Sequence, residues 1–150
     1  MDSYVERAPV EVLRVRADMY GSGPAGAMAL LESKIPGLRG RKFYGAFREL
    51  PEGEEYFACV ERIASDDPDR MTVEIGQLPG GLYARRKLYH WEEIIAAGRL
   101  GEHFREMIQV HGIDRSRPEI EYYRSMTELH LLLPVEKRNP TSPAVPSGRV

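Results

Sequence analysis

The chain has 150 residues, of which 42% are hydrophobic and 29% are charged, and its formal net charge is −2. A chain of this length folds by default as one domain with a substantial core, and its charge balance argues against binding to nucleic-acid phosphates. Cys59 is the single cysteine, so an internal disulfide is excluded, and its apolar neighbours predict a buried, inert thiol.

The sequence shows no targeting segment. Residues 1–7 carry acids and lack the apolar stretch of a signal peptide. No run of residues is apolar enough over a sufficient length to span a bilayer. We therefore expect a cytoplasmic protein that binds neither membranes nor, directly, nucleic acid.

The first half of the chain has the pattern strand, helix, strand, strand. β-Branched and charged residues alternate over 10–17, which predicts a strand. Apolar residues recur at helical spacing over 25–35, and a Pro-Gly pair ends that helix. Two further strands are predicted at 42–48 and 54–63, joined by a Pro-Glu-Gly turn.

The second half has the same order of elements after an exposed polar connection at 66–69. The helical segment 91–110 is interrupted by Gly98 and Gly101, which predicts two shorter helices or a kink. The strands expected in this half are 71–78, 81–89, and a closing hairpin of 119–124 and 128–135.

These elements place one domain at 1–137, followed by a tail at 138–150. The tail has prolines at 140, 143 and 146 among Ser, Thr and Asn, a composition typical of a flexible segment.

The two halves, about 9–64 and 70–137, resemble each other. Residues 45–48 (Gly-Ala-Phe-Arg) align with 121–124 (Glu-Tyr-Tyr-Arg), and later matches follow in the same order. This preserved order favours an internal duplication. Two strand-helix-strand-strand units predict an α+β fold with a mostly antiparallel sheet and the helices on one face. Because only one copy carries the carboxylate, Glu121, we expect a binding cleft between the halves.

Two short motifs carry a family resemblance. Residues 78–84, Leu-Pro-Gly-Gly-Leu-Tyr-Ala, are similar to the entry to the second half of gyrase-inhibitor-like (GyrI-like) proteins. Residues 119–123, Glu-Ile-Glu-Tyr-Tyr, with the strand 128–135, are similar to the Glu-x-Tyr strand and final strand of that family. GyrI-like proteins bind small molecules and also form effector-binding domains of multidrug-responsive transcription activators. The resemblance spans residues 9–137.

The resemblance implies a cleft that takes bulky lipophilic, often cationic molecules, using one acid and several aromatic side chains. By position, that acid is Glu121. The chain departs from the family where Phe47 replaces the tyrosine of a Gly-x-Tyr motif, which keeps an aromatic ring and loses a hydroxyl. A second departure is His90-Trp91, where many relatives have a glycine.

Strand alternation selects the aromatic residues that could surround Glu121. Glu119, Glu121 and Tyr123 share one face of their strand, and we expect Phe47 to face them from the other half. Phe57 and Tyr83 avoid the most aliphatic strand faces, and Trp91 begins the second-half helix. The candidate ligand-binding residues are therefore Glu121, Tyr123, Phe47, Phe57, Tyr83 and Trp91.

Simpler interpretations remain beside this one. Glu121 could be an edge-strand glutamate paired with Arg124, Arg41 or Lys42, and the aromatic residues could be ordinary core. The four histidines have no metal-ligand spacing, so we expect neither a metal nor a cofactor. Ser125 near His130 lacks an orienting acid, so no nucleophilic triad is indicated.

The leading functional hypothesis is a stand-alone binding protein for lipophilic, often cationic compounds, acting by multidrug-type effector binding or sequestration. The chain leaves no room for a DNA-binding helix-turn-helix beside this domain, so a role in transcription would require a separate protein partner. An alternative is a hydrolase of strained electrophilic molecules, with Glu121 activating water and Tyr123 or Tyr83 stabilising the oxyanion. A second alternative, implied by the namesake of the family, is a protein-interaction role such as gyrase inhibition.

Overall fold

The computed structural model describes residues 1–137, and the tail predicted at 138–150 lies outside this range. The strands are β1 (Ser3–Arg7), β2 (Val10–Arg16), β3 (Phe43–Leu50), β4 (Gly53–Glu61), β5 (Glu74–Leu78), β6 (Gly81–Tyr89), β7 (Glu119–Tyr123) and β8 (Glu128–Pro134). The helices are α1 (Gly23–Lys34), α2 (Pro68–Met71), α3 (Trp91–Ala96) and α4 (Leu100–His111).

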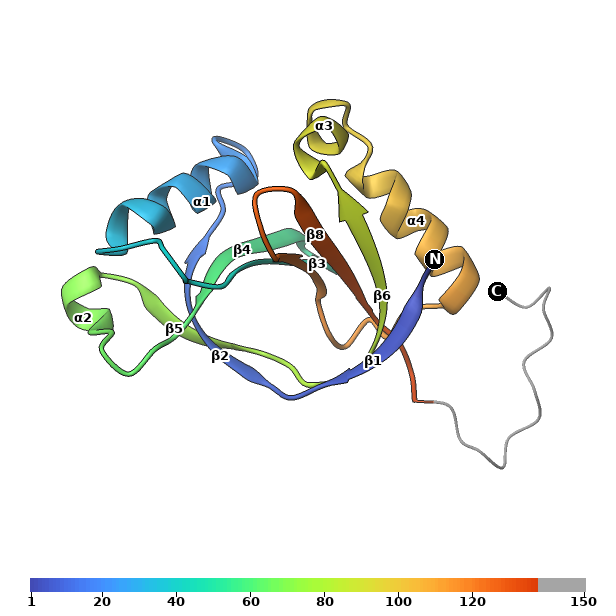
Figure 1. Ribbon diagram of the computed structural model, residues 1–150, viewed down its shortest axis with the longest axis horizontal. Helices are drawn as coiled ribbons and strands as arrows, with labels where there is room; N and C mark the ends of the chain where they lie inside the picture. The colour runs from blue at the N-terminus through green and yellow to red at the C-terminus, as the bar shows by residue number, and fades with distance from the viewer. Residues whose placement is uncertain (138–150) are drawn as a thin grey trace.

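The strands form one eight-stranded sheet in the order β1-β6-β8-β7-β3-β4-β2-β5. All neighbouring strands are antiparallel. The sheet curls strongly, and α1, α3 and α4 lie along one side of it (Figure 1). This arrangement confirms the predicted α+β fold with two strand-helix-strand-strand units. Between them, β3 and β7 make the central contact of the sheet.

Two continuous extended segments, called ribbons below, each run from one side of the sheet to the other. β1 runs into β2 and β5 runs into β6, so that Arg7 pairs with Gly81 and Val10 with Leu78. At the bend, a Cβ on Gly80 would lie 2.8 Å from the Arg7 carbonyl oxygen, so only glycine allows the ribbons to approach this closely. Each ribbon therefore contributes one strand to each half of the molecule.

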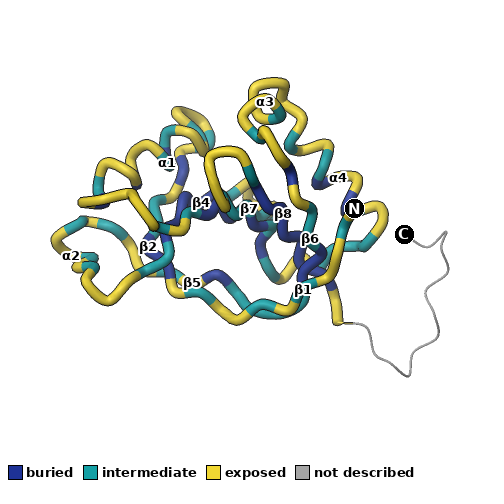
Figure 2. Tube along the Cα trace, in the orientation of Figure 1, coloured by how far each residue is buried: buried dark blue, intermediate teal, exposed yellow. Residues whose placement is uncertain are grey.

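The helices cover two apolar clusters on one face of the sheet. Helix α1 packs Ala27 and Leu31 against the first half, and α4 packs Phe104 and Met107 against the second half. A third cluster occupies the opposite face, where it contains residues of both halves: Val12, Tyr44, Ala46, Phe57, Cys59, Leu78, Tyr83, Ile120 and Leu132. Both faces of the sheet are therefore buried, as Figure 2 shows for the central strands.

Several sequence predictions need correction. Strand β1 and the single-turn helix α2 were not expected, and β5 begins at Glu74 rather than at residue 71. The predicted interruption of the second-half helix is confirmed, because Gly98 has a φ of +69° between α3 and α4. Cys59 is buried, as predicted. Among residues 1–137, no helix has the length and apolar character required to cross a membrane.

Candidate functional site

Glu121 lies at the centre of the molecule, on the face of the sheet that carries the helices. In the β3–β7 ladder, Glu121 pairs directly with Gly45, its counterpart in the sequence duplication. The two aligned positions therefore meet across the junction of the halves. One of them carries a carboxylate and the other carries no side chain.

The absence of a side chain at position 45 is what makes room for the acid. A Cβ on Gly45 would overlap the Tyr56 hydroxyl and would lie 2.6 Å from Glu121 Oε1, which is closer than such atoms approach one another. Gly45 is buried, with no positive φ to explain it, so its role is to leave space. The Tyr56 hydroxyl and the Glu121 carboxylate occupy the space that a Cβ at position 45 would need.

Two tyrosines hold the Glu121 carboxylate. The Tyr56 hydroxyl donates to Glu121 Oε1 at 2.9 Å, and the Tyr123 hydroxyl donates to the same oxygen at 2.7 Å. Both donors are neutral. None of the ion pairs formed among residues 1–137 includes Glu121. The carboxylate is thus hydrogen-bonded without a counter-charge.

Burial sets the electrostatics of this group. It raises the pKa of Glu121 above its ordinary value, and the hydrogen bonds from Tyr123 and Tyr56 oppose the shift only in part. Burial together with the adjacent Glu121 charge also raises the pKa of both tyrosines, so both stay protonated and act as donors. Glu119, on the same strand face, has its pKa raised to about 7, chiefly by burial.

Aromatic side chains from both halves extend the site. Trp91 packs edge-on against Tyr123, with ring centroids 5.2 Å apart, and its indole Nε1 donates to the Ser125 carbonyl oxygen at 3.0 Å. Phe47 lies beside Tyr56 in the β3–β4 ladder and packs with the cluster under α1. Trp91, Tyr123 and Phe47 are all partly buried, as is Glu121.

The same architecture occurs in solved structures of other proteins. No family model and no curated protein matches the chain. An integron cassette protein from Vibrio cholerae has a similar structure, with a TM-score of 0.68 and 14% identity over 90% of this chain and 95% of that one. The protein SAV2435, solved bound to tetraphenylphosphonium, has a TM-score of 0.57 and 14% identity over 91% and 94% of the two chains. A hydrolase from Listeria innocua has a TM-score of 0.53 and 10% identity over 90% and 91%.

The architecture is consistent with a GyrI-like fold. At identities this low the similarity establishes the fold alone, and the function has to be argued from the side chains of this chain.

Two of the residues chosen from the sequence lie away from Glu121. Phe57 and Tyr83 belong to the apolar cluster on the opposite face of the sheet, where the Tyr83 hydroxyl donates to the Pro79 carbonyl oxygen at 2.5 Å. Their placement beside Glu121 was wrong because both faces of the strands are buried, so alternation alone did not say which face carries the helices.

Tyr56 is the site residue that the sequence analysis missed. It is buried on the helix face, one residue before Phe57. Alternation from Gly45 through the β3–β4 hairpin would have placed it beside the acid. Two of the three alternative partners for Glu121 are engaged elsewhere, because Arg41 pairs with Asp66 at 2.7 Å and Lys42 with Glu61 at 3.8 Å. The third, Arg124, is in none of the ion pairs formed among residues 1–137.

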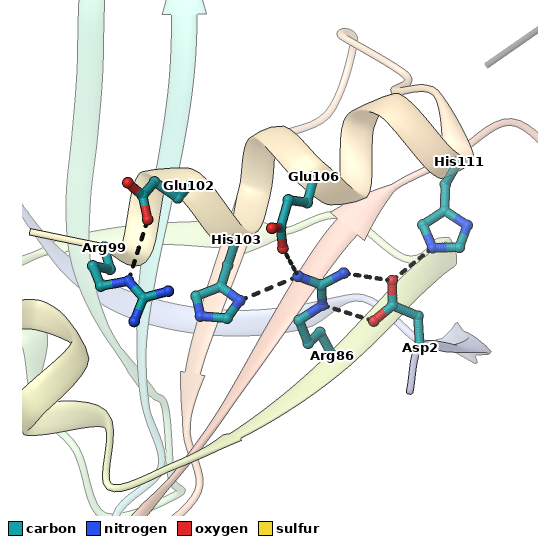
Figure 3. Close-up of polar contacts among 7 residues, drawn as sticks. All are labelled: Asp2, Arg86, Arg99, Glu102, His103, Glu106 and His111. Carbon is teal, nitrogen blue, oxygen red and sulfur yellow. Dashed lines mark hydrogen bonds and ion pairs between the residues drawn. The ribbon is translucent and has the colours of Figure 1, made fainter.

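Two of the four histidines, His103 and His111, lie on α4 in a polar cluster that includes none of the residues around Glu121. Figure 3 shows Arg86 between Asp2 and Glu106, with His103 and His111 on either side. His111 Nε2 lies 2.8 Å from Asp2 Oδ2, and His111 Nδ1 lies 2.7 Å from the Tyr4 hydroxyl. These contacts fasten the N-terminal strand to α4 and give His103 and His111 structural partners.

Proposed function

We propose that the protein binds lipophilic cations at the Glu121 site. The observation that carries this proposal is a partly buried carboxylate that accepts two neutral hydroxyl donors and has no cation near it among residues 1–137. A carboxylate in this position is costly to ionise. A bound organic cation would supply the positive charge that the two hydroxyl donors lack. The ligand would therefore lower the free-energy cost of ionising Glu121 in the folded protein.

Aromatic neighbours support a lipophilic ligand. The Tyr123 hydroxyl contacts the carboxylate, and the partly buried ring of Trp91 packs against Tyr123. Ring faces attract organic cations by about 1–2 kcal/mol where water is excluded. SAV2435, which shares the fold, was solved with such a cation, tetraphenylphosphonium. Effector binding or sequestration of such compounds is the use that this site supports best.

A pair of ligands of matched shape and opposite charge tests the proposal. Trp91 is the only tryptophan, so its fluorescence reports directly on the site. We expect tetraphenylphosphonium to change the emission saturably and tetraphenylborate to bind far more weakly. Glu121→Gln keeps the size of the side chain and should weaken tetraphenylphosphonium binding about tenfold or more.

The matched control is Glu54→Gln, an exposed glutamate on β4 whose loss should leave the affinity unchanged. Equal binding of the two ions, or unchanged affinity in Glu121→Gln, would contradict the proposal.

A second candidate function is hydrolysis of strained electrophilic molecules. The raised pKa of Glu121 makes it a stronger base than an ordinary carboxylate, and the hydroxyls of Tyr56 and Tyr123, which donate to Glu121 here, would stabilise a leaving oxygen by turning toward it. Tyr83 cannot share this role, because its hydroxyl lies on the other face of the sheet. Turnover of an epoxide that persists in Glu121→Gln would exclude this mechanism.

The protein-interaction alternative remains a prediction without a supporting observation in the described residues.

A further inference from the structure

A cavity lies on the face of the sheet opposite the helices, beneath strands β2, β3 and β4. Its volume is about 140 Å³, far above the roughly 10–15 Å³ that one water molecule requires. Residues of the ribbon that joins β5 to β6 and of the loop before β7 also line it. The lining residues are Val12, Arg14, Ala46, Arg48, Glu55, Phe57, Cys59, Gln77, Leu78, Pro79, Ser116 and Pro118.

This cavity is separate from the Glu121 site. Ala46 and Phe57 line it, and they alternate along β3 and β4 with Gly45 and Tyr56, which face Glu121. Successive side chains of a strand point to opposite faces, so the thickness of the sheet lies between the two sites. Occupancy of one site therefore requires no contact with the other.

Three charged side chains line the cavity, and two of them are already paired. The guanidinium of Arg14 lies 3.9 Å from the centroid of the Phe57 ring, and its Nε donates to Glu74 Oε1 at 2.6 Å. Glu55 accepts from Arg16 at 3.0 Å. The acid in the lining is thus neutralised by an arginine of β2.

Arg48 is the charged side chain of the lining that has no hydrogen-bond or ion-pair partner among residues 1–137. Its Nε is buried without a hydrogen-bond acceptor, and the side-chain hydrogen bonds and ion pairs found among residues 1–137 do not involve it. The nearby Glu49 points to Arg115, 4.0 Å away. A buried donor without an acceptor costs about 1–3 kcal/mol, and more when the group is charged. A guanidinium has a planar set of donors that fits a carboxylate in a two-point contact.

We propose that this cavity binds a small organic anion, a carboxylate attached to one flat apolar group. Arg48 pairs with the carboxylate. The apolar group contacts the Phe57 ring, Val12, Ala46 and Leu78, which supply a hydrocarbon surface on four strands. The protein then has two sites of opposite preference, with a cation bound on the helix face and an anion on the far face.

Benzoate is the simplest probe of this chemistry. In a ¹³C-methyl NMR titration, we expect saturable shifts of the Ala46 and Val12 methyl signals. In ¹⁵N-edited spectra of the same titration, we expect a shift of the Arg48 Nε–H signal as it gains an acceptor. Arg48→Met preserves the length of the side chain without its charge, and we expect it to weaken benzoate binding about tenfold or more. Benzyl alcohol, which has the ring without the charge, should bind weakly to both proteins.

The control variant is Arg62→Met, which removes a partly exposed arginine paired with Glu11 outside the cavity and should leave benzoate binding unchanged. Arg48→Met should also bind tetraphenylphosphonium as the parent does, so failure here is distinguishable from failure at Glu121. The proposal is overturned if benzoate causes no saturable shift, if Arg48→Met binds it equally well, or if inorganic phosphate binds and benzoate does not.

Discussion

Glycine at position 45 determines whether the carboxylate site can exist at all. The duplication brings positions 45 and 121 opposite each other at the centre of the sheet. Two large side chains cannot occupy this point together, because the Tyr56 hydroxyl and Glu121 Oε1 already fill the space beside the Gly45 Cα. One copy therefore contributes the functional group and the other contributes the space that it needs.

Gly45→Ala should destabilise the protein and disrupt the site. The added methyl group must displace Tyr56 or Glu121, and such overpacking costs about 1–3 kcal/mol in the free energy of unfolding. Urea denaturation measures the loss, and tetraphenylphosphonium titration measures the damage to the site. Gly37→Ala is the control, since a Cβ there meets no atom within 4 Å and the backbone has no positive φ. Equal stability of both variants would contradict this account.

Because the pKa of Glu121 is raised in the folded protein, its effect on the free energy of unfolding should change with pH in a defined direction. An acid whose folded-state pKa lies above its unfolded value stabilises the fold at low pH, and this contribution is lost as pH rises through the folded pKa. Glu121→Gln stays neutral at every pH. The free energy of unfolding of the variant should therefore rise relative to the parent as pH increases from the ordinary glutamate range through the raised folded pKa, by about 1.4 kcal/mol per unit of pKa difference.

Urea unfolding of both proteins at several pH values makes this measurement. Glu119, with its pKa raised to about 7, adds a pH dependence of the same sign, and the Glu121 charge contributes to that shift, so Glu121→Gln is compared with the parent in a Glu119→Gln background. A difference that is constant with pH would show that Glu121 ionises normally in the folded protein.

At the scale of elements, β1 depends on polar contacts more than on its own sequence. Of its five residues, Val5 is the one that packs against the apolar cluster opposite the helices. This alternation of apolar and polar residues was too weak to predict a strand. The strand is fastened by Asp2, which accepts two hydrogen bonds from Arg86 and contacts His111 (Figure 3). These partners are 84 and 109 residues away in the chain, so no local pattern could have revealed them.

Asp2→Asn should loosen β1 and lower the free energy of unfolding by about 1–2 kcal/mol, since hydrogen bonds to a charged group are lost. The hydrogen bond from Arg86 is the largest cause that lowers the pKa of Asp2 below 3.8. A lowered pKa stabilises the fold above the unfolded value, and that stability is lost as pH falls through the folded pKa. The difference between parent and variant should therefore shrink below pH 4.

Hydrogen exchange of the β1 amides and urea unfolding both report this change. Glu6→Gln is the control on the same strand, because within residues 1–137 Glu6 makes only an exposed ion pair with Lys137, and its loss should have little effect. Unchanged exchange rates in Asp2→Asn would show that strand pairing with β6 alone holds β1.

The other elements were more accessible from the sequence. The apolar residues at helical spacing over 25–35 and the glycine between α3 and α4 were sufficient for α1, α3 and α4, and alternation was sufficient for β2, β3, β4 and the closing hairpin. Helix α2 was missed although Asp67 caps it and Pro68 begins it, which are recognised start signals. Glu121 and Tyr123 were found together because they share a strand face, whereas Tyr56 required the register of a hairpin.

At the scale of the molecule, the two halves share a core that neither can complete alone. The apolar cluster opposite the helices takes Val12, Tyr44, Ala46, Phe57 and Cys59 from the first half, and Leu78, Tyr83, Ile120 and Leu132 from the second. The ribbons also pair across the halves, since β1 joins β6 and β2 joins β5. A separated half would expose half of this cluster and two unpaired strand edges.

We therefore expect fragments 1–64 and 65–137, divided in an exposed loop, to fold only when they are combined. Each fragment alone should lack a cooperative thermal transition and dispersed NMR signals, because the apolar surface of the shared cluster stays in water. Mixing the fragments should restore both the transition and tetraphenylphosphonium binding, since Gly45 and Tyr56 come from one fragment and Glu121 from the other. A cooperative transition in either isolated fragment would mean that a single strand-helix-strand-strand unit is stable by itself. The site would then be formed by docking two folded units, rather than in the same step that forms the shared core.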